Sequence, residues 1–530
     1  MINISKKKDC CGCNACGDVC PKHSITFKID KEGFWYPEVE MDTCIDCHLC
    51  EKVCPLLNKE EYKNIDGYVK PKTYALVHKN IEVRFDSTSG GAFTALAEEV
   101  YKQGGFVGGA IYNEDWSVSQ FLSSSKNDLP KLRSSKYLQS HFDGFYKSVK
   151  EALKTEKPVL VCGSPCQMAA MFRYLKKPYE NLIIVDYICR GIASPMYFRK
   201  WINYLENKHN SKVIFYKAKS KELGWRKLST RIEYANGEAD VIAGHDNPWL
   251  MMQYKVPEIC RPSCFECSFK GFPRTSDITM GDLWAKKGSI PQNLDGDLGT
   301  SIVFANNAKG EAFLSRCFKK VEYKEFPFET AVKGNFHLEN AVRHSSYDRE
   351  TFFQDLNESF EECIDKYIPE FNHQQYSVKS KTKNFLKFVW KISSASGWSI
   401  STWRKNLWYN IFSSKVKTSI FKGHYFIIEK NCTIQINSKG RLILDSALYF
   451  GTKKVKGSIL DSRLLIESGG IMRIYGGDYS ISYGADIEVF RNALLEIGGG
   501  VGANIGLTIV CGDKIKIGKN SGCGRNVTIR

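Results

Sequence analysis

The first 55 residues carry one cysteine pattern twice, Cys-x-x-Cys-x-x-Cys-x-x-x-Cys-Pro. The copies run from Cys10 to Pro21 and from Cys44 to Pro55. With this spacing, each [4Fe-4S] cluster is held by the first three cysteines of one copy and the last cysteine of the other. Because the ligation is crossed, the segment can fold only as one small domain around its metal. The predicted ligand sets are Cys10, Cys13, Cys16 and Cys54 for one cluster, and Cys44, Cys47, Cys50 and Cys20 for the other.

Zinc binding and disulfide formation are the alternative uses of these cysteines. A zinc site takes four ligands, usually as two separated pairs, and the triplet spacing fits that poorly. Disulfides need an oxidising compartment, and residues 1–10 hold three lysines and no apolar stretch, so we expect no secretory signal. Iron-sulfur ligation in a cytoplasmic protein is therefore predicted. Cys11 is surplus to the pattern and receives no predicted role.

With 530 residues the chain is too long for one hydrophobic core. We predict a multidomain protein that combines α+β and α/β domains. No uncharged apolar run approaches the roughly 18 residues that span a bilayer. The predicted parts are a small ferredoxin-like domain (1–60), an α/β oxidoreductase domain (71–345), a helical basic linker rich in aromatic residues (346–425), and a β-helix segment (426–530).

Residues 71–345 alternate short apolar strands with helical segments, which is typical of an α/β layer fold. The turn from Ser87 to Gly91 precedes a predicted helix, and its free amides can bind a phosphate or simply cap that helix. Six further cysteines fall in three later loops, which converge if they follow parallel strands. They are Cys162, Cys166, Cys189, Cys260, Cys264 and Cys267. Strands are expected at 106–112, 159–162, 182–188 and 277–280, and helices at 92–103, 144–154, 167–175 and 195–205.

These stretches resemble the beta subunit of coenzyme F(420) hydrogenases and dehydrogenases, a flavin and iron-sulfur module. The resemblance spans about residues 73–284, and the leading ferredoxin-like domain fits the longer members of that family. It rests on residues 89–93, 133–140, 163–167, 186–191, 264–267 and 276–284.

The resemblance implies a bound FAD and a third [4Fe-4S] cluster close to it. The implied cluster ligands are Cys166, Cys189, Cys264 and Cys267, with Cys162 and Cys260 in reserve. For the flavin, it implies a phosphate contact at Ser89, Gly90 and Gly91, with Lys136 and Arg190 as charge partners. Two other interpretations stay open: Cys162, Cys317 and Cys363 as small buried apolar residues, and a zinc site at Cys264 and Cys267.

The net charge of +17 is unevenly distributed. No acidic residue occurs between Glu370 and Glu429, where basic and aromatic residues alternate. Phe385, Phe388, Val389 and Ile392 have helical spacing with lysines between them, which suits a helix on an anionic lipid surface. A basic helix that buries its aromatic residues against a neighbour is an equal alternative. We therefore predict peripheral contact with the inner membrane face through 379–422, and no nucleic-acid binding.

From about Phe426 short β-rich stretches with glycine follow a six-residue rhythm, which predicts a stacked β-helix. Residues 408–530 resemble the hexapeptide-repeat acyltransferases of surface-polysaccharide synthesis, whose fold is a left-handed β-helix. Those enzymes use a histidine on a late coil as general base, and the last histidine here is His424, before the coils. We therefore expect an incomplete module without acyltransferase activity, and a homotrimer if the β-helix is complete.

The leading hypothesis is an iron-sulfur and FAD oxidoreductase, with a role in surface-polysaccharide biosynthesis. The alternatives are an electron-transfer subunit without its own substrate site, and an acyltransferase whose catalytic end is missing. The expected partner is a redox protein or a small deazaflavin-like electron carrier. No catalytic residue can be assigned from the sequence.

Overall fold

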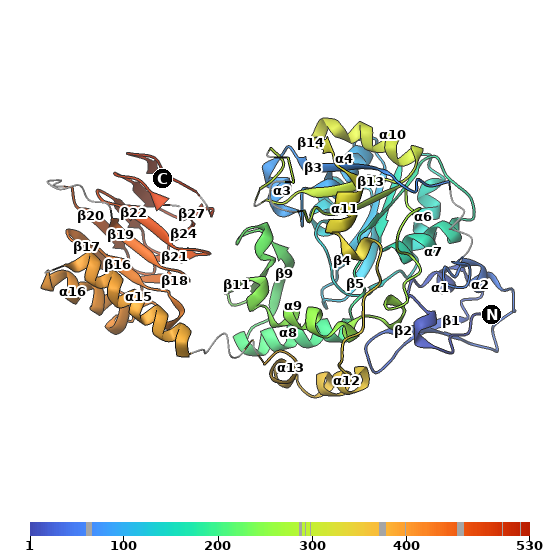
Figure 1. Cartoon of the computed structure of the whole chain (residues 1–530), viewed down its shortest axis with the longest axis horizontal. Coiled ribbons are helices and arrows are strands. Elements are labelled where there is room, and N and C mark those ends of the chain that lie inside the picture. Colours follow the sequence, from blue (N-terminus) through green and yellow to red (C-terminus); the bar gives the residue numbers. More distant parts are fainter. Residues whose placement is uncertain are drawn as a thin grey trace. The chain divides into compact units, whose positions relative to one another are not determined.

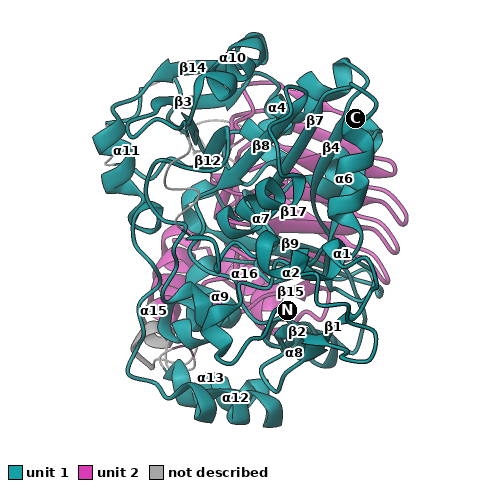
Figure 2. Cartoon of the chain, turned by 90° about the vertical axis from the view of Figure 1, so that its right-hand side faces the viewer, with its two compact units in different colours: residues 1–369 teal, residues 370–530 magenta. Residues whose placement is uncertain are grey.

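The fold was analysed in a computed structural model (Figure 1). The chain forms two compact units, residues 1–369 and residues 370–530 (Figure 2). The four-part division drawn from the sequence is finer than this and remains a prediction. The structure describes residues 1–59, 66–285, 289–291, 293–296, 298–369, 371, 378–397, 399–452, 460–500, 502–519 and 521–530.

The two cysteine copies fold in the same way. Each contains a five-residue helix, α1 (Ala15–Val19) and α2 (Leu49–Val53), which ends directly before the fourth cysteine of its copy. Each helix follows a residue in the left-handed conformation, Asn14 with φ 60° and His48 with φ 58°. The repeated sequence therefore produces a repeated local structure. The antiparallel hairpin between the copies consists of β1 (Ile25–Ile29) and β2 (Trp35–Val39).

In the described part of residues 1–369, nine strands form a mixed sheet in the order β14-β3-β13-β12-β8-β7-β4-β5-β6. Its centre, β12-β8-β7-β4, is parallel, and antiparallel pairs flank that centre on both sides. The multidomain mixed α/β class expected from the sequence is therefore correct. The strand bounds are β3 Lys72–His78, β4 Phe106–Tyr112, β5 Val118–Ser123, β6 Ser140–His141, β7 Val159–Gly163, β8 Leu182–Tyr187, β12 Ile278–Asp282, β13 Ser301–Ala305 and β14 Val321–Glu325.

Helices cover both faces of this sheet because its central strands are apolar on both sides. In β7, Val159 and Val161 pack toward α6 and α7, whereas Leu160 packs toward α4 and α10. Helix α7 begins two residues earlier than expected, because Ser164 and Gln167 form a capping box and Pro165 occupies the first helical position. The helix bounds are α3 Ile81–Asp86, α4 Ala92–Lys102, α5 Leu129–Leu132, α6 Phe145–Leu153, α7 Pro165–Leu175 and α10 Ala308–Cys317.

A smaller antiparallel sheet and several helices complete residues 1–369. The sheet has the order β11-β10-β9, and its strand β9 carries alternating lysines that reach the main sheet. The bounds are β9 Val213–Ser220, β10 Ser229–Tyr234, β11 Ala239–Ile242, α8 Pro195–His209, α9 Pro248–Lys255, α11 Phe328–Gly334, α12 Arg349–Glu358 and α13 Phe360–Tyr367.

The cysteine-rich segment is docked onto the sheet domain by buried polar contacts. The carboxylate of Asp18 accepts hydrogen bonds from the backbone amides of Gly144 (2.8 Å) and Tyr146 (3.1 Å), so it caps helix α6 from a distant part of the chain. Arg349 of α12 holds the carboxylate of Glu32 with two hydrogen bonds, at 3.1 and 2.8 Å. The position of the cysteine segment is therefore set by the sheet domain.

Residues 370–530 combine two helices with three parallel sheets, as far as the structure describes them. Successive strands rotate among the sheets, whose orders are β15-β18-β21-β24-β27, β16-β19-β22-β25 and β17-β20-β23-β26-β28. The bounds are α15 Val378–Ser396, α16 Ile400–Leu407, β15 Val416–Lys417, β16 Phe426–Ile428, β17 Cys432–Ile436, β18 Arg441–Leu444, β19 Leu448–Thr452, β20 Ser462–Ile466, β21 Ile471–Tyr475, β22 Tyr479–Ser482, β23 Asp486–Val489, β24 Leu494–Gly498, β25 Gly502–Ala503, β26 Thr508–Cys511, β27 Lys514–Ile517 and β28 Thr528–Ile529.

Apolar side chains stack inside this three-sheet coil from one turn to the next. Leu442, Met472, Leu495 and Ile515 are in register on neighbouring strands, and the first three are fully buried. They are spaced 30, 23 and 20 residues apart, so the turns of the coil differ in length. The connectivity is that of a parallel coil, whereas its handedness and a hexapeptide origin remain predictions.

Replacing Asp18 tests the docking of the cysteine segment. Asp18→Ala removes the cap of α6, and we expect it to lower the free energy of unfolding by about 0.5–2 kcal/mol. Denaturant unfolding of the full chain, followed by helical circular dichroism, measures this change. Asp143→Ala, whose side chain is 73% exposed, is the matched control. Equal losses in both variants would contradict the capping role.

Candidate iron-sulfur site

The four thiols predicted to hold the second cluster surround one hollow. Cys20, Cys44, Cys47 and Cys50 line a cavity of about 360 Å³ between the two cysteine copies. Backbone amides approach two of the sulfurs: Ser24 N donates to Cys20 Sγ at 3.3 Å, and Ile2 N donates to Cys50 Sγ at 3.2 Å. Such hydrogen bonds are one of the factors that set the potential of a cluster.

The predicted ligands of the first cluster are also neighbours. Cys16 is buried, and burial is the main reason that the pKa of its thiol is raised well above the usual value. The charges of Cys13, Cys10, Cys54 and Cys50 raise this pKa further, so all of these thiols lie near Cys16. Metal binding would relieve this repulsion, because the thiols release their protons to solvent and the metal ions balance the thiolate charge.

A larger cavity of about 510 Å³ lies beyond the carboxyl ends of β7 and β8. All four ligands implied for the third cluster line it, from the start of α7, the loop after β8, and the loop before β12. Gly191 allows the loop after β8 to pack closely against Cys260, since a Cβ there would lie only 2.9 Å from Cys260 Sγ. Among the described residues, the thiols lining this cavity are those of Cys11, Cys166, Cys189, Cys264 and Cys267.

The surroundings of this cavity favour negative charge. Arg190 and Lys270 line it, and the Lys270 amine donates to the backbone carbonyl of His337 at 2.8 Å. Ile192 N donates to Cys264 Sγ at 3.4 Å. Burial, with the charge of Lys270, lowers the pKa of His337 to about 4, so this imidazole is neutral at ordinary pH.

The two reserve cysteines do not line the cavity. Cys260 is buried behind Gly191, and Cys162 lies in β7 within the core cluster that contains Leu160, where the charges of Asp186 and Lys136 affect it. Burial raises the pKa of Cys162 to about 12, as for a small apolar residue. In the described part of the chain, no group of three or more Cys, His, Asp or Glu side chains is arranged to hold a single metal ion.

Cys11, which had no predicted role, is the fifth thiol of this cavity. Its thiol packs beside Cys13 and Cys166, and contact with these two thiols, together with burial, raises its pKa well above the usual value. The same contact is the main reason that the pKa of Cys166 is lowered to about 7. In the sequence, Cys11 directly follows the predicted ligand Cys10, but this position does not show which groups its thiol contacts.

The Ser87–Gly91 turn packs tightly against the main sheet. Ser89 Oγ donates to the carbonyl of Thr300 at 2.6 Å, and a Cβ at Gly90 would lie 2.3 Å from the carbonyl oxygen of Leu76. Gly91 caps helix α4 with φ +93°. Packing therefore explains these three residues whether or not a phosphate binds there.

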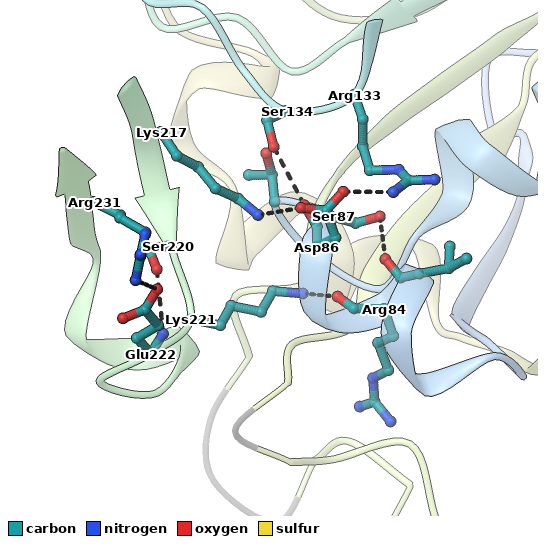
Figure 3. A network of polar contacts seen from close by, with 12 residues as sticks. Arg84, Asp86, Ser87, Arg133, Ser134, Lys217, Ser220, Lys221, Glu222 and Arg231 are labelled. Carbon is teal, nitrogen blue, oxygen red and sulfur yellow. Dashed lines mark hydrogen bonds and ion pairs between the residues drawn. The ribbon is translucent and has the colours of Figure 1, made fainter. Parts of the chain in front are cut away.

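Cations from separate elements gather around this turn (Figure 3). Lys217 and Arg133 both form ion pairs with Asp86, and Lys221 donates to the backbone carbonyls of Arg84 and Ser89. The lysines alternate along and just after β9, a period-two pattern visible in the sequence. These cations were not among the residues predicted from it.

A second ion pair lies at the carboxyl end of β12. The Lys219 amine is 2.7 Å from the Asp282 carboxylate and 5.8 Å from the centre of the Tyr137 ring. Burial is the main reason that the pKa of Tyr137 is raised, while Lys219 opposes this rise. The three groups therefore lie side by side at this end of the sheet.

The structure separates the two predicted charge partners of the flavin. Lys136 donates to the carbonyls of Lys131 (2.7 Å) and Arg133 (2.9 Å), and burial lowers its pKa to about 7. Arg190 lines the cysteine cavity instead, 5.1 Å above the ring of Tyr254. Their contacts with a flavin remain predictions.

Two protein-family profiles match this chain. Residues 156–330 match the family of the coenzyme F420 hydrogenase/dehydrogenase beta subunit, in its C-terminal region, and residues 9–57 match the 4Fe-4S dicluster domain. The profiles cover the two cysteine copies and the later part of the sheet domain, which includes Cys166, Cys189, Cys264 and Cys267 of the large cavity. The part of the chain from residue 1 to 369 is therefore an iron-sulfur electron-transfer protein related to subunits of F420 hydrogenases and dehydrogenases.

Individual relatives are distant. An uncharacterized protein of Methanocaldococcus jannaschii is 24% identical over 344 residues, covering 58% of this chain and 86% of the relative. One subunit of the F(420)H(2) dehydrogenase of Methanosarcina mazei is 22% identical over 188 residues, covering 33% of this chain and about half (51%) of the relative. A chain of the F420-reducing [NiFe] hydrogenase complex from Methanosarcina barkeri is similar at 17% identity and a TM-score of 0.34, covering 53% of this chain and 100% of that chain.

Replacing Asp86 tests whether its ion pairs with Lys217 and Arg133 stabilise the Ser87–Gly91 turn. Burial raises the pKa of this carboxyl, but hydrogen bonds and charge from Lys217 and Arg133 outweigh burial, so the pKa is lowered. The ionised group therefore stabilises the fold above its unfolded pKa, and this contribution is lost as the pH falls through the lowered value. We expect Asp86→Asn to cost on the order of 1 kcal/mol near pH 7, because the carboxylate is 46% exposed.

Hydrogen-exchange protection of residues 83–95 measures the effect of Asp86→Asn. The loss should be constant from about pH 5 to pH 8, where the wild-type carboxylate stays ionised. Asp115→Asn is the control, since its carboxylate is 67% exposed and lies away from this turn. A loss of protection that changes across this pH range would contradict a stabilising role for the ion pairs of Asp86.

Proposed function

We propose that this chain is an iron-sulfur flavoprotein oxidoreductase, in which electrons pass between the N-terminal [4Fe-4S] clusters and FAD through a third [4Fe-4S] cluster. The observation that carries the proposal is the cavity at the carboxyl ends of β7 and β8. Loops far apart in sequence bring Cys166, Cys189, Cys264 and Cys267 to it, and its other walls carry positive charge.

The residues of this cavity fit a thiolate-bound cluster. Four thiols supply the donor set, Lys270 and Arg190 would balance its negative charge, and the Ile192 amide would stabilise one thiolate. When bound, clusters carry single electrons, and a flavin can exchange one or two. The contribution of the chain is to hold the thiolates, balance their charge and keep bulk water away.

The cations near the Ser87–Gly91 turn support FAD binding at that end of the sheet. Burial lowers the pKa values of Lys136 and Lys221 to about 7, so their positive charge lacks a full counter-charge. A pyrophosphate would supply it. Lys219, Asp282 and Tyr137 would then hold the proton that accompanies two-electron chemistry.

The electron partner in this proposal is a redox protein or a deazaflavin-like carrier. The name of the M. mazei relative supports it, since that protein is part of a dehydrogenase. An electron-transfer subunit without its own substrate site is the second candidate, because the two cavities of about 510 and 360 Å³ are both lined by predicted cluster cysteines.

The C-terminal coil contributes a further part of the proposal. Its parallel stacking supports a β-helix, and a homotrimer or a role in surface-polysaccharide biosynthesis rests only on resemblance. Acyltransferase activity is not expected, because the last histidine, His424, precedes the stacked coil strands β17–β28.

We also propose that the helices of residues 378–412 contact an anionic membrane surface. Helix α15 buries Phe388 and Ile392 against the coil, whereas Leu386 and Trp390 are 60% and 63% exposed. Lysines flank this exposed stripe, and Phe412 farther along is 68% exposed. The side chains of Lys379, Lys381 and Lys383 lie outside the described residues. No helix in the described part is both long and apolar enough to cross a membrane.

Cofactor content tests the main proposal. Protein purified without oxygen should contain about 12 iron atoms per chain, as three cubanes require, and release FAD on acid treatment. Cys264→Ser should lose about four iron atoms while the N-terminal pair keeps its signal, because separate sites need not couple. Cys317→Ser, a buried thiol outside the cavity, is the control. Clusters without flavin would favour the second candidate, and unchanged iron would contradict the ligand assignment.

Flotation with lipid vesicles tests the membrane proposal. The full chain should float with anionic phosphatidylglycerol vesicles and not with phosphatidylcholine vesicles. Trp390→Ser together with Phe412→Ser should reduce flotation several-fold, whereas Phe336→Ser, at an exposed aromatic residue of the other unit, should not. Equal binding to both vesicle types would contradict the proposal.

A further inference from the structure

The permanent cations that line the large cavity differ in their exposure to solvent. Among the described residues these cations are Arg190, Lys270 and Arg274. The first two are half-buried, whereas Arg274 is only 4% exposed. Water screens a charge that it can reach, and a buried charge acts more strongly on its neighbours because the surrounding dielectric constant is lower. Arg274 is therefore the lining cation whose charge would act most strongly on a group bound in the cavity.

Two of the three guanidinium nitrogens of Arg274 have partners in the protein. Nη1 donates to the carboxylate of Asp186 at 3.3 Å, and Nη2 donates to the carbonyl of Leu338 at 3.2 Å. The Nε atom is buried and has no hydrogen-bond partner among the described residues. A buried donor without an acceptor destabilises a fold, so we expect this N–H group to find its acceptor in the cavity that Arg274 lines.

The counter-ion of Arg274, Asp186, is held from the side of the sheet. It lies near the end of β8, is 1% exposed, and is not among the described residues that line the cavity. Its other carboxylate oxygen accepts a hydrogen bond from Thr279 Oγ1 at 2.6 Å, and Thr279 is its register partner on β12. Asn306 donates in turn to Thr279 Oγ1 at 2.9 Å. The ion pair therefore keeps its negative end in the sheet and its positive end at the cavity wall.

We propose that Arg274 raises the reduction potential of the third cluster, and that Asp186 is a positioning residue that holds the guanidinium at the cavity and partly offsets its charge. This inference rests on the proposed third cluster. When one electron enters that cluster, the donor cluster is oxidised by one electron, and no bond or proton changes at Arg274. The added negative charge is stabilised by a fixed cation nearby, so reduction becomes more favourable. A guanidinium stays charged at any ordinary pH, so the effect needs no protonation step.

The first test removes the charge of Arg274 in the full chain, purified without oxygen. Redox titration followed by electron paramagnetic resonance measures the third cluster, whose signal is the one that Cys264→Ser lacks. Arg274→Met should lower the ratio of reduced to oxidised third cluster about tenfold at a fixed potential, as expected for a partly offset charge at an effective dielectric constant near 20. For a one-electron couple this is a shift of about 59 mV to lower potential. Arg274→Lys keeps a positive charge and should restore most of the ratio.

The second test removes the charge of Asp186 and leaves the guanidinium in place. Asp186→Asn has nearly the same shape and can still accept the hydrogen bond from Thr279. Without the offsetting carboxylate, the charge of Arg274 should act more fully, so the ratio of reduced to oxidised third cluster should rise severalfold. Opposite shifts in Arg274→Met and Asp186→Asn are the signature of charge, because a loss of packing would disturb the site in the same direction in both variants.

Iron content and a distant arginine separate the outcomes. Every variant should keep about 12 iron atoms per chain, since neither residue is a cluster ligand. Arg231→Met, which removes a guanidinium paired with Glu222 beside the smaller sheet, should leave the potential of the third cluster unchanged.

Full iron with an unchanged potential in Arg274→Met would overturn the inference. If Arg274→Met loses the third cluster, Asp186→Asn decides: a higher potential supports the inference, and an unchanged or lower one overturns it. Wild-type protein with only about eight iron atoms would instead refute the third cluster, and the proposed function with it.

Discussion

A single buried arginine joins the cysteine segment to the sheet domain, and the arrangement of the cysteines depends on it. Arg261 has no exposed surface, and its guanidinium donates to the carbonyls of Cys10 and Trp35 and to the side chain of Gln139, at 2.7, 3.0 and 2.8 Å. It also lies 4.2 Å above the ring of Tyr36. Burying a cation without such partners would destabilise the folded protein, so these contacts keep the Arg261 guanidinium in this position. The same residue precedes the Cys264 loop in the chain, and it therefore holds the first copy against the loop that lines the large cavity.

One side of the large cavity follows from the direction of the strands, whereas the loop before β12 adds Cys264 and Cys267. Four neighbouring parallel strands end at the same edge of the sheet, so the loops after β7 and β8 and the segment after β12 meet there. The cysteine loops occupy one part of this edge and the lysines of β9 another. Both parts collect positive charge, which suits groups that become more negative on reduction. In the proposed function, the first part serves one-electron chemistry and the second serves two-electron chemistry.

The C-terminal unit has a different physical basis. Its stability comes from stacked apolar side chains in a coil whose strands pair only with the turns before and after them. Helix α15 covers part of this coil with Phe388 and Ile392 and leaves Trp390 exposed. The sequence allowed two interpretations of this helix, packing against a neighbour or contact with a membrane surface. One side of the helix packs against the coil, and another side carries exposed apolar and basic residues.

The sequence by itself determined the features that depend on near neighbours. Three of the four predicted ligands of each N-terminal cluster lie within seven residues, and the apolar runs of β4 and β7 matched the strands predicted there, because periodicity and spacing are local properties. The resemblance to a known family added the four other cysteines of the large cavity. The position of Cys11 in that cavity, the burial of Arg261 and the pairing of Lys219 with Asp282 were decided only by the tertiary structure. Each depends on groups brought together from 60 to 250 residues apart, and no local pattern in the chain records such a contact.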